Sequence, residues 1–169
     1  MPRISEINPD LASGKIKEII DRHIAQGHAL TGEKRTLLHN AEAFEALESS
    51  SYALDDELQR LIGKRAADFF EYAISIENDC IVCTTYFGNL LRRNGIDFET
   101  FEFTPKEQVL IEYGRAIAKD PKAVPDELFA RLKDEFSEEE IVVITTMGVL
   151  MIANNYLNDI LEVAPDPVI

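Results

Sequence analysis

Two cysteines separated by two residues are the part of this sequence best suited to chemistry. Cys80 and Cys83 are the only cysteines in the chain. Residues three apart lie on one face of a helix with Cβ atoms about 5–6 Å apart, so a small adjustment can join their sulfurs in a disulfide. We expect Cys80 to fall in the first turn of a helix, where free backbone N–H groups favour a thiolate. The spacing therefore predicts a reversible dithiol.

Two other interpretations of the pair remain open. Free cysteines are often buried as small apolar side chains, and such a pair would be chemically inert. A zinc site would need two further ligands, and His23, His28 and His39 do not show the paired spacing of zinc ligands. We therefore expect neither a metal nor a bound cofactor. Two cysteines also do not make a secreted disulfide scaffold, so cytoplasmic redox chemistry is the favoured interpretation.

Polar side chains in the preceding segment could assist the thiols. The row consists of Asp68, Glu71, Tyr72 and Ser75. Their i, i+3, i+4, i+7 spacing places them on one helix face, which either supports the dithiol or is simply solvated, since charged residues are mostly exposed. Tyr86 could donate a hydrogen bond to a Cys83 thiolate, although core packing is the favoured role for an aromatic side chain.

Helices must position these residues, because apolar side chains recur at helical spacing through almost the whole chain and no strand alternation or repeat is evident. Capping residues predict some seven helices, with a polar connection over Thr31–Arg35 and a possible break at Ser49–Ser51. The predicted helices span about residues 9–27, 36–58, 63–77, 79–93, 105–119, 125–136 and 138–163. We therefore predict an all-α fold, a compact helical bundle that forms a single domain over residues 1–169.

Composition narrows the classes of function. The chain has 169 residues, 46% of them hydrophobic, and a formal net charge of −14. Such a surface repels phosphate backbones and anionic membranes, so we expect no nucleic-acid partner and no membrane. The apolar stretch Ile141–Ala153 is shorter than the roughly 20 residues of a membrane span. Residues 1–8 lack the apolar run of a secretory signal, and the expected location is the cytoplasm.

The surroundings of the cysteines resemble a known family. An acidic residue, Asp68, lies twelve positions before Cys80, and Asn78 lies two positions before it. This arrangement resembles the alkyl hydroperoxidase D-like branch of the carboxymuconolactone decarboxylase family, in which the acid is usually Glu. Gly95 and the segment Asn155–Asp159 fit the same pattern. The resemblance covers about residues 35–166.

The resemblance implies a helical antioxidant fold that is usually oligomeric, a trimer or a multiple of one. It implies that Cys83 attacks a peroxide, that Cys80 resolves the product as a disulfide, and that Asp68 starts a proton relay. The disulfide would be re-reduced by a dithiol such as a lipoylated protein. The family histidine four positions after the second cysteine is Phe87 here, and Val82 occupies a position that is often histidine. Phenylalanine cannot transfer a proton, so the usual relay is broken at this point.

Three functions follow in order of preference. The first is a thiol–disulfide oxidoreductase, an antioxidant peroxidase acting through Cys80 and Cys83. The second is a weakly catalytic or non-catalytic helical oligomer that senses oxidation or binds a small molecule. The third, decarboxylation of a muconolactone, lacks an evident paired His/Arg site. The segment 141–160 is apolar on more than one side, which predicts a central core helix or a subunit contact.

Overall fold

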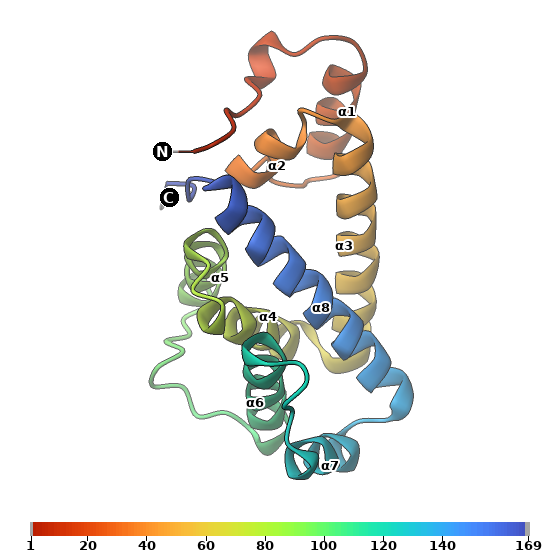
Figure 1. The fold of residues 1–169 in the computed structure, drawn as a ribbon, viewed down its shortest axis with the longest axis vertical. Coiled ribbons are helices and arrows are strands. Elements are labelled where there is room, and N and C mark those ends of the chain that lie inside the picture. Colours follow the sequence, from red (N-terminus) through yellow and green to blue (C-terminus); the bar gives the residue numbers. More distant parts are fainter. Residues whose placement is uncertain (1, 168–169) are drawn as a thin grey trace.

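The computed structural model describes residues 2–167, and within them it contains helices and no β-strand (Figure 1). A short 3₁₀ helix, η1 (Pro9–Leu11), precedes eight α-helices. The α-helices are α1 (Gly14–Ala25), α2 (Gly32–Leu37), α3 (Ala41–Ile62), α4 (Lys64–Glu77), α5 (Ile81–Arg93), α6 (Pro105–Lys119), α7 (Asp126–Glu135) and α8 (Glu138–Leu161). The all-α prediction is confirmed, with one α-helix more than the seven expected.

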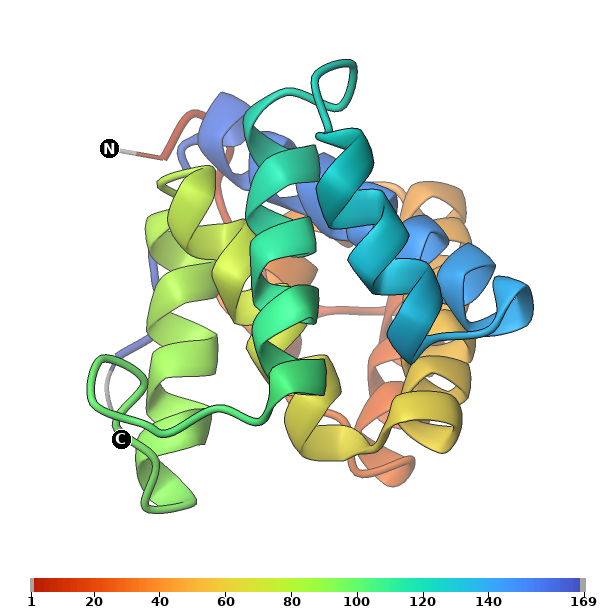
Figure 2. The same ribbon diagram turned by 90° about the horizontal axis from the view of Figure 1, so that it is seen from below.

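The core forms where α4 packs against α6 and where α8 crosses both α3 and α4. In Figure 1, α8 runs diagonally through the centre of the molecule, and Figure 2 shows α7 beside α6. Phe70 of α4 is fully buried at this crossing. A Cβ atom added at Gly148 would lie 2.6 Å from Ile117 Cδ1 and 2.9 Å from Phe70 Cζ. Glycine at this position therefore lets three helices approach one another closely.

Helix ends follow local sequence signals over most of the chain. Thr104 and Ser137 each form a capping box with a glutamate three residues later, at the starts of α6 and α8. In each box, the hydroxyl accepts a backbone N–H bond and the glutamate accepts one in return, so two otherwise unpaired donors are satisfied. Gly63, with φ 86°, separates α3 from α4. The predicted starts of α4, α6 and α8 are confirmed, whereas α3 ends at Ile62 and not near residue 58.

Two predictions about the first half of the chain are wrong. Asn8 and Pro9 open only η1, and α1 starts anew at Gly14, whose φ is 57°. Leu11, expected to face inward, is 81% exposed as a result. The serines at 49–51 do not interrupt α3, because the Ser50 hydroxyl donates to the Ala46 carbonyl at 2.9 Å and is satisfied within the helix.

Two further differences affect the region around the cysteines. The expected connection at Thr31–Arg35 is mostly helical, because Thr31 caps α2 by accepting a hydrogen bond from the Lys34 N–H. Asn78, expected to cap the following helix, instead ends α4. Asp79 follows with a φ of 54°, in the left-handed region. Cys80 comes next and immediately precedes α5.

The apolar helix α8 has one buried face and one exposed face. Its buried residues include Ile144, Met147 and Met151, whereas Val142 and Val149 are exposed. Within residues 2–167, α8 is the one helix that is long and apolar enough to cross a membrane, with 33% of its most apolar 18-residue window buried. A single helix of this kind is weak evidence for a membrane span, because the core helix of a soluble protein passes the same test.

Candidate functional site

The tight turn between α4 and α5 holds the two cysteines. The Cys80 N–H donates to the Ser75 carbonyl at 3.2 Å, and the Cys80 carbonyl accepts the Thr84 N–H at 2.9 Å. Cys80 therefore occupies the N-cap position of α5, just before the first turn in which it was expected, and Cys83 lies in that first turn. Both side chains are free thiols and both are buried, with exposed fractions of 0% for Cys80 and 5% for Cys83.

Two asparagine side chains fix this turn against the rest of the fold. Asn78 Nδ2 donates to the Ala118 carbonyl of α6 at 3.2 Å. Asn155 Nδ2, on α8, donates to Asn78 Oδ1 at 3.1 Å. The asparagine that matches the family pattern thus connects the cysteine turn to two other helices, and its role in this structure is to position the turn.

The two thiols differ in their electrostatic surroundings. A hydrogen bond from the Cys83 thiol lowers the pKa of Cys80, and the backbone amides of Cys83 and Val82 add to this effect against the opposing effect of burial. The pKa of Cys83 is raised by the neighbouring Cys80 sulfur, by burial and by the negative charge of Glu33. Of the two thiols, Cys80 is therefore the one that ionises more readily. Which sulfur attacks an oxidant stays a prediction.

Two residues from outside the cysteine segment complete the surroundings of Cys83. Asn158 of α8, 1% exposed, donates from Nδ2 to Cys83 Sγ at 3.4 Å. Glu33, half-buried in the first turn of α2, is near enough to the same asparagine and to Cys83 to affect them electrostatically. Burial raises the pKa of Glu33 to about 6, and the Asn158 side chain opposes this shift.

Sequence reasoning did not identify these two residues as part of the site. Asn158 lay in a segment that matched the family only as a helix, and Glu33 lay in the expected polar connection. The one local signal for Glu33 was Thr31, a good N-cap residue that could have indicated the helix on which Glu33 is carried.

The polar row on α4 is buried, so its interpretation as a solvated face is wrong. Asp68, Glu71 and Ser75 have exposed fractions of 5%, 4% and 0%. Burial raises the pKa of Asp68, while Lys64, whose Nζ lies 3.0 Å from the Asp68 carboxylate, opposes this. Burial also raises the pKa of Glu71 well above its usual value, and the nearby charges of Asp55 and Asp68 act in the same direction.

The aromatic residues near the dithiol are arranged differently from expectation. Tyr86 is 52% exposed, so the core role favoured for it is wrong, and its ring meets the edge of Phe87 at 5.2 Å between centroids. Phe87 is buried in the same apolar cluster as Cys80 and Cys83. Tyr72 is half-buried and its ring packs against Phe98 at 4.9 Å. An apolar ring thus occupies the position of the family histidine.

A second group of polar side chains lies next to Glu33. Lys34 Nζ lies 3.0 Å from Glu48 Oε2 and donates to the Tyr52 hydroxyl at 2.5 Å. The Tyr52 ring stacks on His28 at 3.8 Å. Burial, followed by the charge of Glu48, raises the pKa of Tyr52. Across residues 2–167, no group of three or more His, Cys, Asp or Glu side chains is arranged to hold a metal ion.

Comparison with known proteins gives a structural likeness and no sequence match. No family model matches the chain, and no curated protein matches it. A peroxidase-related protein from Ralstonia eutropha JMP134, described as having an alkylhydroperoxidase AhpD core, superposes with a TM-score of 0.74 at 18% identity, over 98% of this chain and 92% of the other. A peroxidase-related protein from Silicibacter sp. TM1040 gives 0.74 at 12% identity, over 96% and 92%.

A third similar structure belongs to a protein that is described as a debrominase and not as peroxidase-related. It is a cysteine-to-alanine variant of the debrominase Bmp8 in complex with 2,3,4-tribromopyrrole. It superposes with a TM-score of 0.81 at 16% identity, over 98% of this chain and 92% of the other. Together with the helix order and the cysteine turn, these superpositions show that the chain has the AhpD-like fold, with its Cys80–Cys83 pair at the start of α5.

Proposed function

We propose that this protein is a thiol–disulfide oxidoreductase that reduces hydroperoxides through Cys80 and Cys83. The observation that carries the proposal is the asymmetry of the pair. Cys80 is favoured as a thiolate by backbone amides, while Cys83 is its hydrogen-bonded neighbour three residues later. A dithiol in which one sulfur ionises more readily and the other lies within reach is suited to disulfide formation and exchange. The peroxidase-related structural neighbours support the choice of oxidant class.

The proposed reaction balances with one hydroperoxide per dithiol. The Cys83 proton first passes to the Cys80 thiolate, and the Cys83 thiolate so formed attacks the hydroperoxide, whose O–O bond breaks. The alkoxide takes a proton from solvent water and leaves as the alcohol, and Cys83 carries a sulfenic acid. The Cys80 sulfur then attacks Cys83, the S–S bond forms and water leaves. A dithiol reductant, such as a lipoylated protein, restores both thiols, which suits a reducing compartment such as the cytoplasm.

A redox sensor is the second candidate, and Phe87 is the observation that favours it. Positioned acid–base groups contribute typically 10²–10⁴-fold to a rate. With a buried phenylalanine ring in place of the family histidine, oxidation could be too slow for a protective enzyme and still be fast enough for a signal. Both candidate functions use the same Cys80–Cys83 disulfide. They differ in turnover number, which is high for a protective enzyme and low for a sensor.

Steady-state consumption of cumene hydroperoxide with dihydrolipoamide as reductant separates these functions. We expect turnover in the wild-type protein and none in Cys83→Ser. Cys80→Ser should consume about one equivalent of hydroperoxide per chain and then stop, since no resolving thiol remains. Turnover that persists in the Cys80→Ser, Cys83→Ser double variant would exclude the proposed function. Wild-type protein that forms the disulfide once and is not re-reduced would favour the sensor.

A further inference from the structure

The proposed reaction needs a hydrogen-bond donor at the Cys83 sulfur. Cys83 has to lose its proton before it attacks, yet the neighbouring Cys80 sulfur and burial raise the pKa of its thiol. Phe87, one turn further along α5, is an apolar ring in the same buried cluster and has no polar hydrogen to donate. A buried thiolate is costly unless a donor reaches it, so the donor must come from another helix.

Asn158 of α8 provides a donor at this place. Its Nδ2 atom donates to Cys83 Sγ at 3.4 Å, and the residue is 1% exposed. The hydrogen bond favours the thiolate and lowers the pKa of Cys83, against the effects of Cys80 and burial. Because the amide is neutral, it stabilises the negative charge without exchanging a proton with the sulfur.

The oxygen of the same amide has no partner. Asn158 Oδ1 is buried and accepts no hydrogen bond from any part of the chain that the structure describes. Buried polar atoms are nearly always hydrogen-bonded, so an exception calls for an explanation such as a catalytic role. Oδ1 and Nδ2 are bonded to the same carbon atom, which places the unpaired oxygen beside the sulfur that Nδ2 contacts. A molecule that meets the sulfur and carries a hydrogen-bond donor therefore fits both atoms of the amide.

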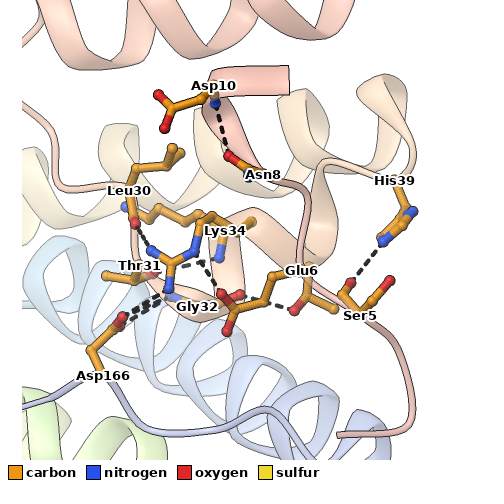
Figure 3. A network of polar contacts seen from close by, with 12 residues as sticks. Ser5, Glu6, Asn8, Asp10, Leu30, Thr31, Gly32, Lys34, His39 and Asp166 are labelled. Carbon is orange, nitrogen blue, oxygen red and sulfur yellow. Dashed lines mark hydrogen bonds and ion pairs between the residues drawn. The ribbon is translucent and has the colours of Figure 1, made fainter. Parts of the chain in front are cut away.

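The end of α8 that carries Asn158 is fixed by contacts with other parts of the chain. The Val163 N–H donates to the Asn158 carbonyl at 2.9 Å and closes the last turn. Just beyond it, both carboxylate oxygens of Asp166 accept the Gly32 N–H of α2, at 3.1 and 3.0 Å (Figure 3). Arg35 lies 3.3 Å from the same carboxylate. Helix ends often fray, and these contacts keep the amide at a set distance from the sulfur.

We propose that Asn158 is a catalytic residue: its Nδ2 stabilises the Cys83 thiolate, and its Oδ1 accepts the O–H of the hydroperoxide and so orients the O–O bond toward the sulfur. The assignment rests on the proposed function, because it names the residue that binds the oxidant in that reaction. It also restricts the substrate class. The oxygen that is attacked has to carry a hydrogen atom, as it does in alkyl hydroperoxides and hydrogen peroxide and does not in dialkyl peroxides.

Asn158 exchanges no proton in this step. The Cys83 thiolate, formed when its proton passes to Cys80, attacks the oxygen that carries the hydrogen atom. The S–O bond forms, the O–O bond breaks, and the alkoxide takes a proton from water, which leaves hydroxide in solution. The O–H group stays on the attacked oxygen as the sulfenic acid, still bonded to Oδ1. The Cys80 thiol then attacks the Cys83 sulfur, the S–S bond forms, and its proton leaves with the sulfenic hydroxyl as water.

The test compares two reagents that react with the same thiolate and differ in hydrogen bonding. Cumene hydroperoxide carries an O–H group. Methyl methanethiosulfonate transfers its methylthio group to a thiolate, releases methanesulfinate, and carries no O–H or N–H group. We would measure the single-turnover rates of both reagents with the whole chain carrying Cys80→Ser, in which Cys83 is the one remaining thiol. Both rates are proportional to the fraction of Cys83 thiolate, so their ratio does not depend on the pKa of Cys83.

Three substitutions are each added to Cys80→Ser. Asn158→Leu keeps the shape of the side chain and removes both polar atoms. Asn158→Asp keeps an acceptor oxygen and removes the donor, and its unchanged size keeps the test available where leucine disturbs folding. Asn154→Leu is the matched control, one turn earlier on α8. Asn154 is half-buried, its Oδ1 is also unpartnered, and no hydrogen bond within residues 2–167 joins it to either cysteine.

Asn158→Leu should raise the pKa of Cys83, measured from the pH dependence of the methanethiosulfonate reaction, by about one unit. It should slow this reagent about 3- to 10-fold at neutral pH, because the higher nucleophilicity of the thiolate offsets only part of its lower population. The hydroperoxide should be slowed about tenfold more, so the ratio of the two rates falls by that factor. Asn158→Asp should slow both reagents and leave the ratio unchanged. Asn154→Leu should change neither the pKa nor either rate.

Four results would contradict the assignment. An unchanged pKa of Cys83 in both Asn158 variants would exclude the amide as the donor to the thiolate. An unchanged ratio in Asn158→Leu would exclude Oδ1 as the group that binds the hydroperoxide, and would leave the proposed function intact. Equal effects of Asn154→Leu and Asn158→Leu would indicate a general disturbance of α8. Cys80→Ser protein that reacts with the methanethiosulfonate and not with the hydroperoxide would remove the proposed function, and the role of Asn158 with it.

Discussion

At the scale of single residues, the proposed chemistry depends on the different surroundings of two cysteine side chains. Cys80 lies at the start of α5, where backbone amides favour its thiolate, and Cys83 lies beside Asn158 and near Glu33. The role of Asp68 in a proton relay stays a prediction. The sequence predicted the cysteine pair at the start of a helix. It could not predict Glu33, because 50 residues separate Glu33 from Cys83 in the chain and only the packing of α2 near α8 brings them together.

Glu33 should also leave a signature in the pH dependence of stability. Its pKa in the folded protein is about 6, against an ordinary value of 4.5, so the native state binds more protons than the unfolded state between these pH values. Stability therefore falls as the pH rises through this window, by at most about 2 kcal/mol. Glu33→Gln should remove this contribution.

Denaturant unfolding at pH 5 and pH 7 measures the effect. We expect the loss of stability between these pH values to be smaller in Glu33→Gln than in wild-type protein. Glu71 contributes a loss of the same sign, but it is present in both proteins and cancels. Glu99→Gln serves as the control for charge removal. An identical pH dependence in Glu33→Gln and wild-type protein would show that Glu33 is not buried as described.

At the scale of helices, strong local signals identified most of the fold. Thr104 followed by proline, the capping box at Ser137 and the glycine at position 63 marked helix starts correctly. The errors arose where local signals were weak or ambiguous. The six-residue helix α2 was missed because its sequence is polar, and Asn78 suits either the end of one helix or the start of the next. Tertiary contacts decide such cases.

The crossing of α4, α6 and α8 gives a prediction at this scale. Gly148→Ala would place a Cβ atom 2.6 Å from Ile117 Cδ1 and 2.9 Å from Phe70 Cζ, in a fully packed part of the core. Overpacking of this kind typically costs about 1–3 kcal/mol, so we expect the free energy of unfolding to fall by that amount.

Gly88→Ala is the matched control, because its Cβ atom would lie 3.4 Å from the nearest side-chain atom, the Tyr72 hydroxyl oxygen, which is ordinary van der Waals contact. Alanine in a helix interior is favoured over glycine by roughly 0.5–1 kcal/mol, so this variant should be as stable as wild-type protein or more stable. Equal stability of the two alanine variants would show that the helices are less closely packed at Gly148.

At the scale of the whole molecule, the exposed apolar residues of α8 bear on assembly. Val149 is 59% exposed and lines a cavity of about 250 Å³ with Phe129 and Ile152, between α7, α6 and α8. We propose that the protein is a homo-oligomer, a trimer or a multiple of one, as the family resemblance implies. An exposed apolar surface on a helix is suited to contact with another copy of the chain.

Light scattering at micromolar concentration tests the assembly. We expect a mass of three chains or a multiple of three for wild-type protein. Val149→Glu should lower this mass if α8 contributes to the contact, since a buried unpaired charge is costly, and circular dichroism should show unchanged helix content. A monomeric mass for wild-type protein at this concentration would contradict the proposal.

The central claim is that Cys80 and Cys83 form a reversible dithiol, and a thiol titration combined with intact mass tests it most directly. After one equivalent of hydroperoxide, we predict the loss of both free thiols per chain and a chain mass lower by two hydrogen atoms. Peptide mapping should show a bond between Cys80 and Cys83 and no covalent dimer. Two thiols that stay unreactive in the native protein, and react only after denaturation, would instead identify the pair as inert core residues.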